Sequence, residues 1–200
     1  EVSMQDLLVN SLRMRPDRIL VGEIRRKRQA EVLFEAMQTG HSVYSTLHAD
    51  TAETTIKRMT NPPIDVPKTV VGAVDLNVVM FRDRRRNFRR VLEIAEVIDG
   101  EDGLKPHTIY DWESQEDTFY KEGSSNEVKD KLSRLTGMTD EEIEKDIETK
   151  TEILEWMVEN DIDDLDSVGR VVAEYYSDEE KTMRKIRDNK TFEELIPSDR

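Results

Sequence analysis

The sequence predicts an α/β protein: a mostly parallel sheet with helices on both faces, followed by a small β-hairpin and an α-helical C-terminal tail. Three observations support this class. Up to about residue 81, short runs of branched apolar residues alternate with helical patterns of about ten residues, which is typical of a parallel sheet. The next run alternates apolar and polar residues, as an antiparallel strand does. Beyond residue 123, acidic helices with recognisable start signals follow one another.

The elements expected in residues 1–98 follow from the spacing of the apolar residues. The first helix keeps a 3/4 spacing and ends near Arg15, because a proline disfavours helix in the residue before it. Gly40 is expected to cap the second helix. The expected order is a helix to Arg15, a strand Arg18–Val21, a helix at about Gln29–Gln38, a strand Ser42–Leu47, a helix at about Thr51–Met59, and strands Leu76–Phe81 and Phe88–Val97.

Residues 99–200 are expected to form a hairpin, Thr108–Trp112 with Thr118–Lys121, and then four helices. Capping boxes at Ser124, Thr139 and Ser177 begin three of these helices, since a Glu follows three residues later in each case. The remaining helix starts near Asp163 or Asp164. The spacing of apolar residues predicts that the long helix buries Ile143, Ile147, Leu154, Met157 and Val158, and that the next buries Leu165, Val168, Val172 and Tyr175.

Composition limits the classes of function. The chain has 36% hydrophobic and 37% charged residues and no cysteine, so disulfides and thiolate metal sites are excluded. No apolar run approaches the ~20 residues that a membrane helix needs. The formal net charge of −14 argues against nucleic-acid binding by the whole surface. The acid is concentrated after residue 98, which predicts a domain boundary between residues 98 and 99.

The first candidate functional residue stands at the end of the first strand. Glu23 follows Gly22 directly after the buried run Ile19–Val21, and several cations follow it. In an open α/β sheet, ligands bind beyond the carboxyl ends of the strands. A glutamate at that position can hold a water or a hydrated Mg²⁺ beside a phosphate and can act as a general base. The alternative is that Glu23 only terminates a strand.

The second strand adds candidates at both of its ends. His41 stands at its start, whereas Thr46 and His48 stand toward the end where a phosphate would lie. A lone histidine is often structural, and this alternative applies above all to His41. A zinc site made by the two histidines is disfavoured, because their spacing is not that of a zinc-binding helix and no cysteine completes it.

These residues resemble a known family. “LRMRPDRILVGEIR” (residues 12–25) and “AMQTGHSVYSTLHAD” (residues 36–50) resemble the type II/type IV secretion ATPases, and among them the archaeal pilus and archaellum motor branch. In that family the first block contains the Walker B element, which ends in Gly-Glu-x-Arg, and the second is the histidine box, Ser-Thr-Leu-His. The resemblance implies that residues 1–98 are the C-terminal part of a RecA-like P-loop ATPase core.

The resemblance implies roles for single residues. Glu23 would be the Walker B acid that polarises the attacking water and contacts Mg²⁺ through water. His48 would contact or sense the γ-phosphate, and Arg25 would organise the site or the subunit interface. Arg13 and Arg15 lie in the family's approach to this strand and could serve the site of a neighbouring subunit.

One part of the family's active site is missing from these 200 residues. A P-loop needs G-x-x-x-x-G-K-[ST], and none of the eight glycines precedes a lysine. We therefore expect the chain to be a piece of a longer protein that binds ATP and Mg²⁺, and we expect no nucleotide bound to the piece alone. The resemblance implies a hexamer in the cytoplasm, peripheral on the inner face of the membrane, with a polytopic membrane platform protein as partner.

Two other interpretations compete for parts of the chain. The run “FRDRRRNFRR” (residues 81–90) is interpreted as a hairpin turn, with a protein or lipid contact and a nucleic-acid contact as alternatives. The acidic tail, residues 124–200, could be a non-catalytic interaction module that docks to a membrane partner. A pilus, an archaellum and another secretion system stay open as the apparatus that such a motor would drive.

Overall fold

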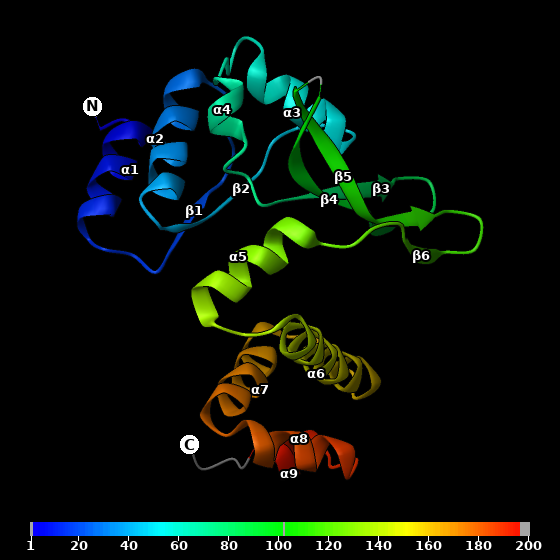
Figure 1. The fold of residues 1–200 in the computed structure, drawn as a ribbon. Coiled ribbons are helices and arrows are strands. Elements are labelled where there is room, and N and C mark those ends of the chain that lie inside the picture. Colours follow the sequence, from blue (N-terminus) through cyan, green and yellow to red (C-terminus); the bar gives the residue numbers. More distant parts are fainter. Residues whose placement is uncertain (1, 102, 197–200) are drawn as a thin grey trace. The chain divides into compact units, whose positions relative to one another are not determined.

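The computed structural model describes residues 2–101 and 103–196, and Figure 1 shows its helices and strands. The chain forms two compact units, one up to Val128 and one from Lys129 onward. The mixed α/β class predicted from the sequence is confirmed. Within the described residues, no helix is both long and apolar enough to cross a membrane.

The first unit begins with a parallel pair of strands covered by two helices. Strands β1 (Arg18–Val21) and β2 (Ser42–Ser45) pair in parallel and are connected by α2 (Lys27–Gln38), while α1 (Met4–Arg13) packs beside α2. Ile19 and Val21 of β1 point into the core, where they meet the buried residues of α2, namely Ala30, Val32, Leu33, Phe34 and Ala36. This core therefore fixes where both strands end.

Helix α1 begins with a capping box at Ser3. The side chain of Ser3 accepts a hydrogen bond from the backbone of Asp6, and the carboxylate of Asp6 accepts one from the backbone of Ser3 at 2.9 Å. This capping box satisfies backbone N–H groups that would otherwise lack a partner.

The parallel part of the sheet is smaller than predicted. Four further strands form a separate antiparallel sheet in the order β3-β4-β5-β6, namely β3 (Leu76–Asp83), β4 (Phe88–Gly100), β5 (Gly103–Glu113) and β6 (Thr118–Lys121). The connections between these strands are only a few residues long, and parallel pairing would need a crossover of a dozen or more. The expectation of a mostly parallel sheet is therefore wrong for the described residues. Helices α3 (Ala52–Thr60) and α4 (Lys68–Val71) lie between the two sheets in sequence.

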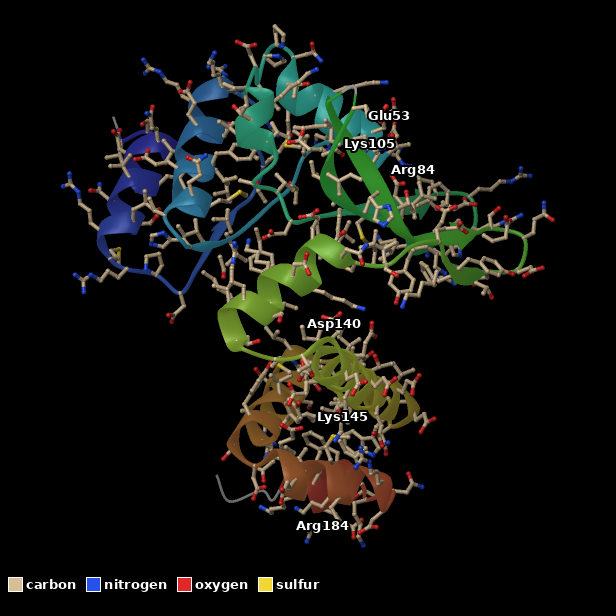
Figure 2. The ribbon with its side chains drawn as sticks, viewed as in Figure 1. Glu53, Arg84, Lys105, Asp140, Lys145 and Arg184 are labelled. Atoms are coloured by element: carbon tan, nitrogen blue, oxygen red, sulfur yellow. The ribbon has the colours of Figure 1, made fainter. Side chains whose placement is uncertain are left out.

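The predicted hairpin turn in the arginine-rich run is confirmed. Strands β3 and β4 pair antiparallel, and Asp83 Oδ1 accepts hydrogen bonds from the backbone N–H groups of Arg85 and Arg86 at 2.7 and 2.9 Å. Figure 2 labels Arg84 on this turn. Arg82 and Arg89 face each other directly across the two strands, and both are exposed.

A second set of contacts joins the β3–β4 hairpin to β5 and to the β5–β6 turn. Arg90 donates two hydrogen bonds to the carboxylate of Asp117, at 2.7 and 2.6 Å, and Trp112 Nε1 donates a third at 2.9 Å. Phe81 and Phe88 pack against the ring of Trp112, at centroid distances of 5.7 and 5.9 Å. An aromatic cluster and a bidentate ion pair thus connect β3 and β4 to the β5–β6 turn.

We expect this contact to weaken in acid. The hydrogen bonds from Arg90 and then Trp112 lower the pKa of Asp117 from 3.8 to about 2. A carboxyl group with a depressed pKa stabilises the folded state fully above its unfolded pKa, and the stabilisation is lost as the pH falls through the folded value. The Trp112 indole N–H resonance should therefore shift between about pH 4 and pH 2. In an Asp117→Asn variant the same resonance should not titrate in this range; if it does, another group controls it.

The predicted boundary between residues 98 and 99 falls inside β4, and the two compact units divide thirty residues later. At the end of the first unit, the carboxylate of Glu96 is fully buried and accepts hydrogen bonds from three groups. These are Ser125 Oγ at 2.6 Å, the Val128 N–H at 2.9 Å and the Glu127 N–H at 3.4 Å. Glu96 therefore caps the N-terminus of α5 (Asn126–Thr136), which replaces the capping box predicted at Ser124.

The second unit consists of helices whose caps follow the sequence closely. The described helices after α5 are α6 (Asp140–Glu159), α7 (Leu165–Ser177), α8 (Glu179–Arg187) and α9 (Phe192–Leu195). Thr139 and Glu142 form the predicted capping box of α6, and Asp164 caps α7. Asp178, rather than Ser177, caps α8. The short α9 was not predicted.

The predicted buried faces of α6 and α7 are partly confirmed, since Ile143, Met157 and Tyr175 are buried and Val168 packs against the core. The core of this unit contains Ile153, Trp156 and Met157 of α6 and Val171 and Tyr175 of α7. Five residues predicted as buried are instead exposed, namely Ile147, Leu154, Val158, Leu165 and Val172. Both helices carry a second apolar stripe beside the buried one, and the apolar spacing alone does not distinguish the two stripes.

Candidate functional site

The two principal candidates, Glu23 and His48, lie beyond the carboxyl ends of neighbouring parallel strands. Glu23 follows β1 by two residues and His48 follows β2 by three. Because β1 and β2 run in parallel and in register from Arg18 with Ser42, both residues emerge at the same edge of the sheet. This is the position at which open α/β sheets bind ligands.

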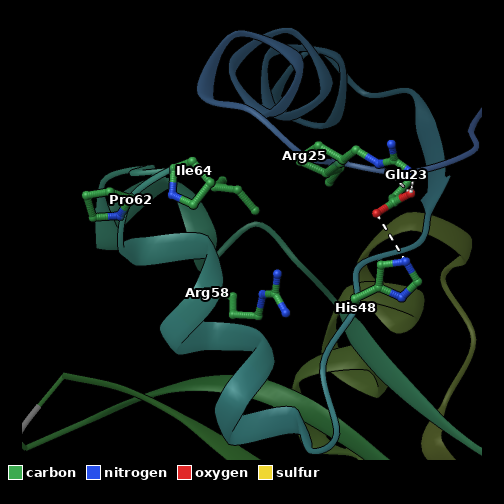
Figure 3. A pocket seen from close by; sticks show the side chains of 8 residues that line it. Glu23, Arg25, His48, Arg58, Pro62 and Ile64 are labelled. Atoms are coloured by element: carbon green, nitrogen blue, oxygen red, sulfur yellow. Dashed lines mark hydrogen bonds and ion pairs between the residues drawn. The ribbon is translucent and has the colours of Figure 1, made fainter.

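Glu23 makes contacts through both carboxylate oxygens. Its Oε2 accepts from Arg25 Nε at 2.7 Å and lies 2.6 Å from Arg25 Nη2, while its Oε1 lies 3.3 Å from His48 Nε2. Figure 3 shows Arg25 and His48 on either side of the carboxylate. The side chain of Glu23 is 22% exposed, against 71% for Arg25 and 81% for His48. The carboxylate is thus sheltered by two cationic or polar side chains that face solvent.

The surrounding charges keep Glu23 ionised. Hydrogen bonding to Arg25 is the main cause that lowers the pKa of Glu23 below 4.5, and the positive charges of Arg25, His48 and Arg58 act in the same direction. A carboxylate with a lowered pKa is deprotonated throughout the neutral range. It can therefore orient a water molecule and accept a proton from it, or bind a hydrated cation, without first losing its own proton.

Thr46 belongs to the framework of the site. Its hydroxyl donates to the backbone carbonyl of Gly22, and its own carbonyl accepts from the Ile24 N–H at 3.0 Å. These two contacts continue the pairing of β1 and β2 past their last ladder residues. They hold the backbone on both sides of Glu23, which fixes the direction in which the carboxylate leaves the chain.

Three predicted residues lie away from this edge. Arg13 ends α1, Arg15 stands between α1 and β1 with φ of 51°, and both are exposed. His41 precedes β2, and its Nδ1 lies 3.2 Å from Thr39 Oγ1 and 3.3 Å from the Ala36 carbonyl. All three stand at the amino ends of the strands, so the structure does not bring them together with Glu23.

The structure adds residues that sequence reasoning missed. A hollow of about 510 Å³ is lined by Glu23, Ile24, Arg25, His48, Arg58, Pro62, Pro63 and Ile64. Arg58 extends from α3 toward the side of the hollow where His48 lies (Figure 3). The sequence placed Arg58 on a helix ten residues after His48, but the direction of that helix relative to the strands could not be derived from spacing.

This arrangement suits an anionic substrate that is attacked by water. Arg25, Arg58 and His48 supply donors or positive charge around one ionised carboxylate, and guanidinium groups bind phosphate oxygens well. Mg²⁺ prefers one or two carboxylates together with waters and substrate phosphates, so Glu23 fits a contact with this ion through water. When bound, Mg²⁺ would neutralise phosphate charge. In the described residues, no three His, Asp or Glu side chains gather into a metal-binding group.

Residues 1–80 match the model of the family described as “Type II/IV secretion system protein”. The chain is 36% identical over 186 residues to the uncharacterized protein MJ0900 of Methanocaldococcus jannaschii, covering 88% of this chain and 33% of that protein. It is 52% identical over 50 residues to the type IV pilus assembly ATPase PilB of Pseudomonas aeruginosa, covering 25% of this chain and 9% of PilB. The chain thus spans about a third of the length of MJ0900.

Among solved structures, the Legionella pneumophila ATPase DotB matches with a TM-score of 0.34 and 21% sequence identity. This match covers 66% of the present chain and 34% of DotB.

Proposed function

Because the chain belongs to the type II/IV secretion ATPase family, we propose that it is the C-terminal part of a motor that hydrolyses ATP to drive assembly or export of pilin-like subunits. The observation that carries the proposal is the contact of Glu23 with both Arg25 and His48 at the carboxyl edge of β1 and β2. The Walker B and histidine-box roles expected from the sequence require these two side chains to meet at one phosphate. Their separation of 25 residues in the sequence makes a chance meeting at this edge a poor explanation.

In this proposal Glu23 polarises the attacking water. The carboxylate accepts a hydrogen bond from the water and takes its proton as the oxygen attacks the γ-phosphorus, which breaks the bond to the leaving ADP oxygen. The lowered pKa of Glu23 keeps the carboxylate deprotonated at neutral pH, so it can accept this proton without first losing its own.

The other side chains would act on the phosphate. His48 stands at the same edge and would contact the γ-phosphate, and its contact with Glu23 would report whether that phosphate is present. Arg58 lines the hollow without any ion pair to a carboxylate among the described contacts, so its guanidinium is available for a phosphate oxygen. We assign Arg25 to positioning of Glu23, and we assign no role in this subunit's own site to Arg13, Arg15 or His41.

The whole protein is proposed to be a hexamer in the cytoplasm, peripheral on the inner face of the membrane, with a polytopic platform protein as partner. The family supports this assignment. The chain covers 33% of MJ0900, so a protein of that length could contain a nucleotide-binding segment outside the matched region. Arg13 and Arg15 are exposed at the opposite end of β1, where a neighbouring subunit could use them.

We expect the 200-residue chain alone to lack ATPase activity, because it contains no G-x-x-x-x-G-K-[ST] loop to hold the phosphates. The measurement is phosphate release with ATP and Mg²⁺, with Glu23→Gln as the matched control for contamination. Turnover by the wild-type chain that disappears in the Glu23→Gln variant would contradict this expectation. Turnover by a longer protein that contains this chain would support the proposed function.

A further inference from the structure

Helices α6 and α7 each expose a seam of the kind that packs against another helix. On α6 the seam consists of Ile147, Thr151, Leu154 and Val158, and on α7 of Leu165, Gly169, Val172 and Tyr176. In both helices the residues are separated by four, three and four positions, which is the spacing of alternating d and a positions in a heptad repeat. Five of these eight residues are the ones that the sequence wrongly predicted to be buried. The other three are Thr151, Gly169 and Tyr176.

The apolar members of the seams are unusually exposed. Leu165 is 86% exposed, Val158 76%, Tyr176 73% and Leu154 59%. The core of the same unit is already complete without them, since Ile153, Trp156 and Val171 are at most 5% exposed. Scattered exposed apolar residues are normal on a protein surface, but apolar residues in register along two helices mark an interaction site.

The two seams lie on consecutive helices that share one core. The connection from α6 to α7 is short, so Val158 and Leu165 lie at the same end of the pair. At the other end, Tyr175 and Tyr176 act electrostatically on Lys150, which stands between Ile147 and Leu154 on α6. The ring of Tyr176 also packs edge-on against Tyr175, with 5.1 Å between the centroids. The two seams therefore come near each other at the α6–α7 connection and again where Tyr176 faces Lys150.

The charge around the seams decides what kind of partner fits. Residues 129–200 contain 22 Asp and Glu against 12 Lys and Arg. Glu148 and Glu155 directly flank the α6 seam, and Asp166 flanks the α7 seam. Of the bases beside the seams, Lys150 is paired with Asp146 at 2.5 Å, and the guanidinium of Arg170 lies over the ring of Phe192. A second copy of the chain would bring the acids beside the α6 seam together, whereas a basic partner would meet opposite charge there.

We propose that the seams of α6 and α7 form a docking surface for a basic amphipathic α-helix of another protein. Such a helix would place its apolar face on Leu154, Val158 and Leu165 and its Lys and Arg residues beside Glu148, Glu155 and Asp166. This inference concerns the helical unit only. It holds whether or not Glu23 acts in ATP hydrolysis.

The test uses the 200-residue chain and a fluorescent synthetic helix of about 18 residues, or five turns, with Leu on one face and Lys on its flanks. Fluorescence anisotropy measures the affinity. The double variant Leu154→Ser/Leu165→Ser should bind at least ~100-fold more weakly, since burial of each leucine contributes roughly tenfold or more. The matched control is Leu135→Ser on α5, where the leucine is 70% exposed outside both seams and the affinity should not change.

A second variant keeps the test independent of the leucines. Glu148→Gln/Glu155→Gln should weaken binding and reduce its dependence on salt, because both charges are exposed and screened. A peptide of the same composition in scrambled order should bind poorly to the wild-type chain. Equal binding of the scrambled peptide, or an unchanged affinity in the leucine double variant, overturns the proposal. Sedimentation that shows self-association abolished by the leucine double variant also overturns it, because the seam is then a contact between copies.

Discussion

In a longer protein that contains this chain and acts as the proposed motor, replacement of Glu23 by Gln is expected to slow ATP hydrolysis by ~10²–10⁴-fold, the usual contribution of a general base. At ~1.4 kcal/mol per tenfold, this corresponds to roughly 3–5 kcal/mol of activation barrier. The glutamine retains the shape of the side chain, and its single amide oxygen can still accept a hydrogen bond from Arg25, but it cannot take a proton from water. Nucleotide affinity should stay near that of wild type, because in the proposed motor a P-loop outside this chain would hold the phosphates.

Separate measurement of turnover and nucleotide affinity distinguishes this mechanism from a structural role. If Glu23 only terminates β1, the variant will hydrolyse ATP within a factor of about three of wild type, far less than the loss of a general base. His48→Ala is the companion variant. It should slow hydrolysis less than Glu23→Gln does, and it should uncouple the nucleotide state from the motion of the motor. The lowered pKa of Glu23 also predicts that its carboxylate stays deprotonated across the neutral range, so protonation of Glu23 should not limit activity there.

Replacement of Glu96 by Ala is expected to lower the free energy of unfolding of the first unit by roughly 2–4 kcal/mol. The change removes the acceptor of three hydrogen bonds from a site with no exposure, and it leaves Ser125 and the first N–H groups of α5 without their partner. A carboxylate at a helix N-terminus also interacts favourably with the helix dipole, and this term is lost as well. Chemical denaturation measures the total effect.

Amide hydrogen exchange locates the effect of Glu96. In the Glu96→Ala variant the Glu127 and Val128 amides should exchange faster, while those of the β1–β2 pair should follow only the global change in stability. Glu96→Gln keeps one acceptor oxygen and should therefore lose less stability than Glu96→Ala. A variant within ~0.5 kcal/mol of wild type, the usual range for neutral surface changes, would mean that the cap does not stabilise the unit.

Much of the fold could be predicted because local signals agree with the final packing. The strand before Gly22 is bounded by Pro16 on one side and glycine on the other, and the caps at Thr139 and Asp164 are purely local. The pairing of Glu23 with His48 could also be expected, because parallel strands joined by one helix end at the same edge.

The remaining features depend on contacts that spacing does not encode. The sequence could not show that Glu96, thirty residues away, would cap α5 in place of Ser124. It could not show which of two apolar stripes on α6 would meet the core, because Trp156 and Leu154 satisfy the same periodicity. Arg58 was missed for a related reason: its place in the site depends on the angle between α3 and the strands.

Salt should act in opposite directions on two contacts of the β3–β4 hairpin. Arg82 and Arg89 repel each other across the strands, and dissolved ions weaken this repulsion. The same ions weaken the attraction between Arg90 and Asp117, one position further along β4. Salt should therefore favour the pairing of β3 with β4 near their turn while it weakens the contact between β4 and the β5–β6 turn.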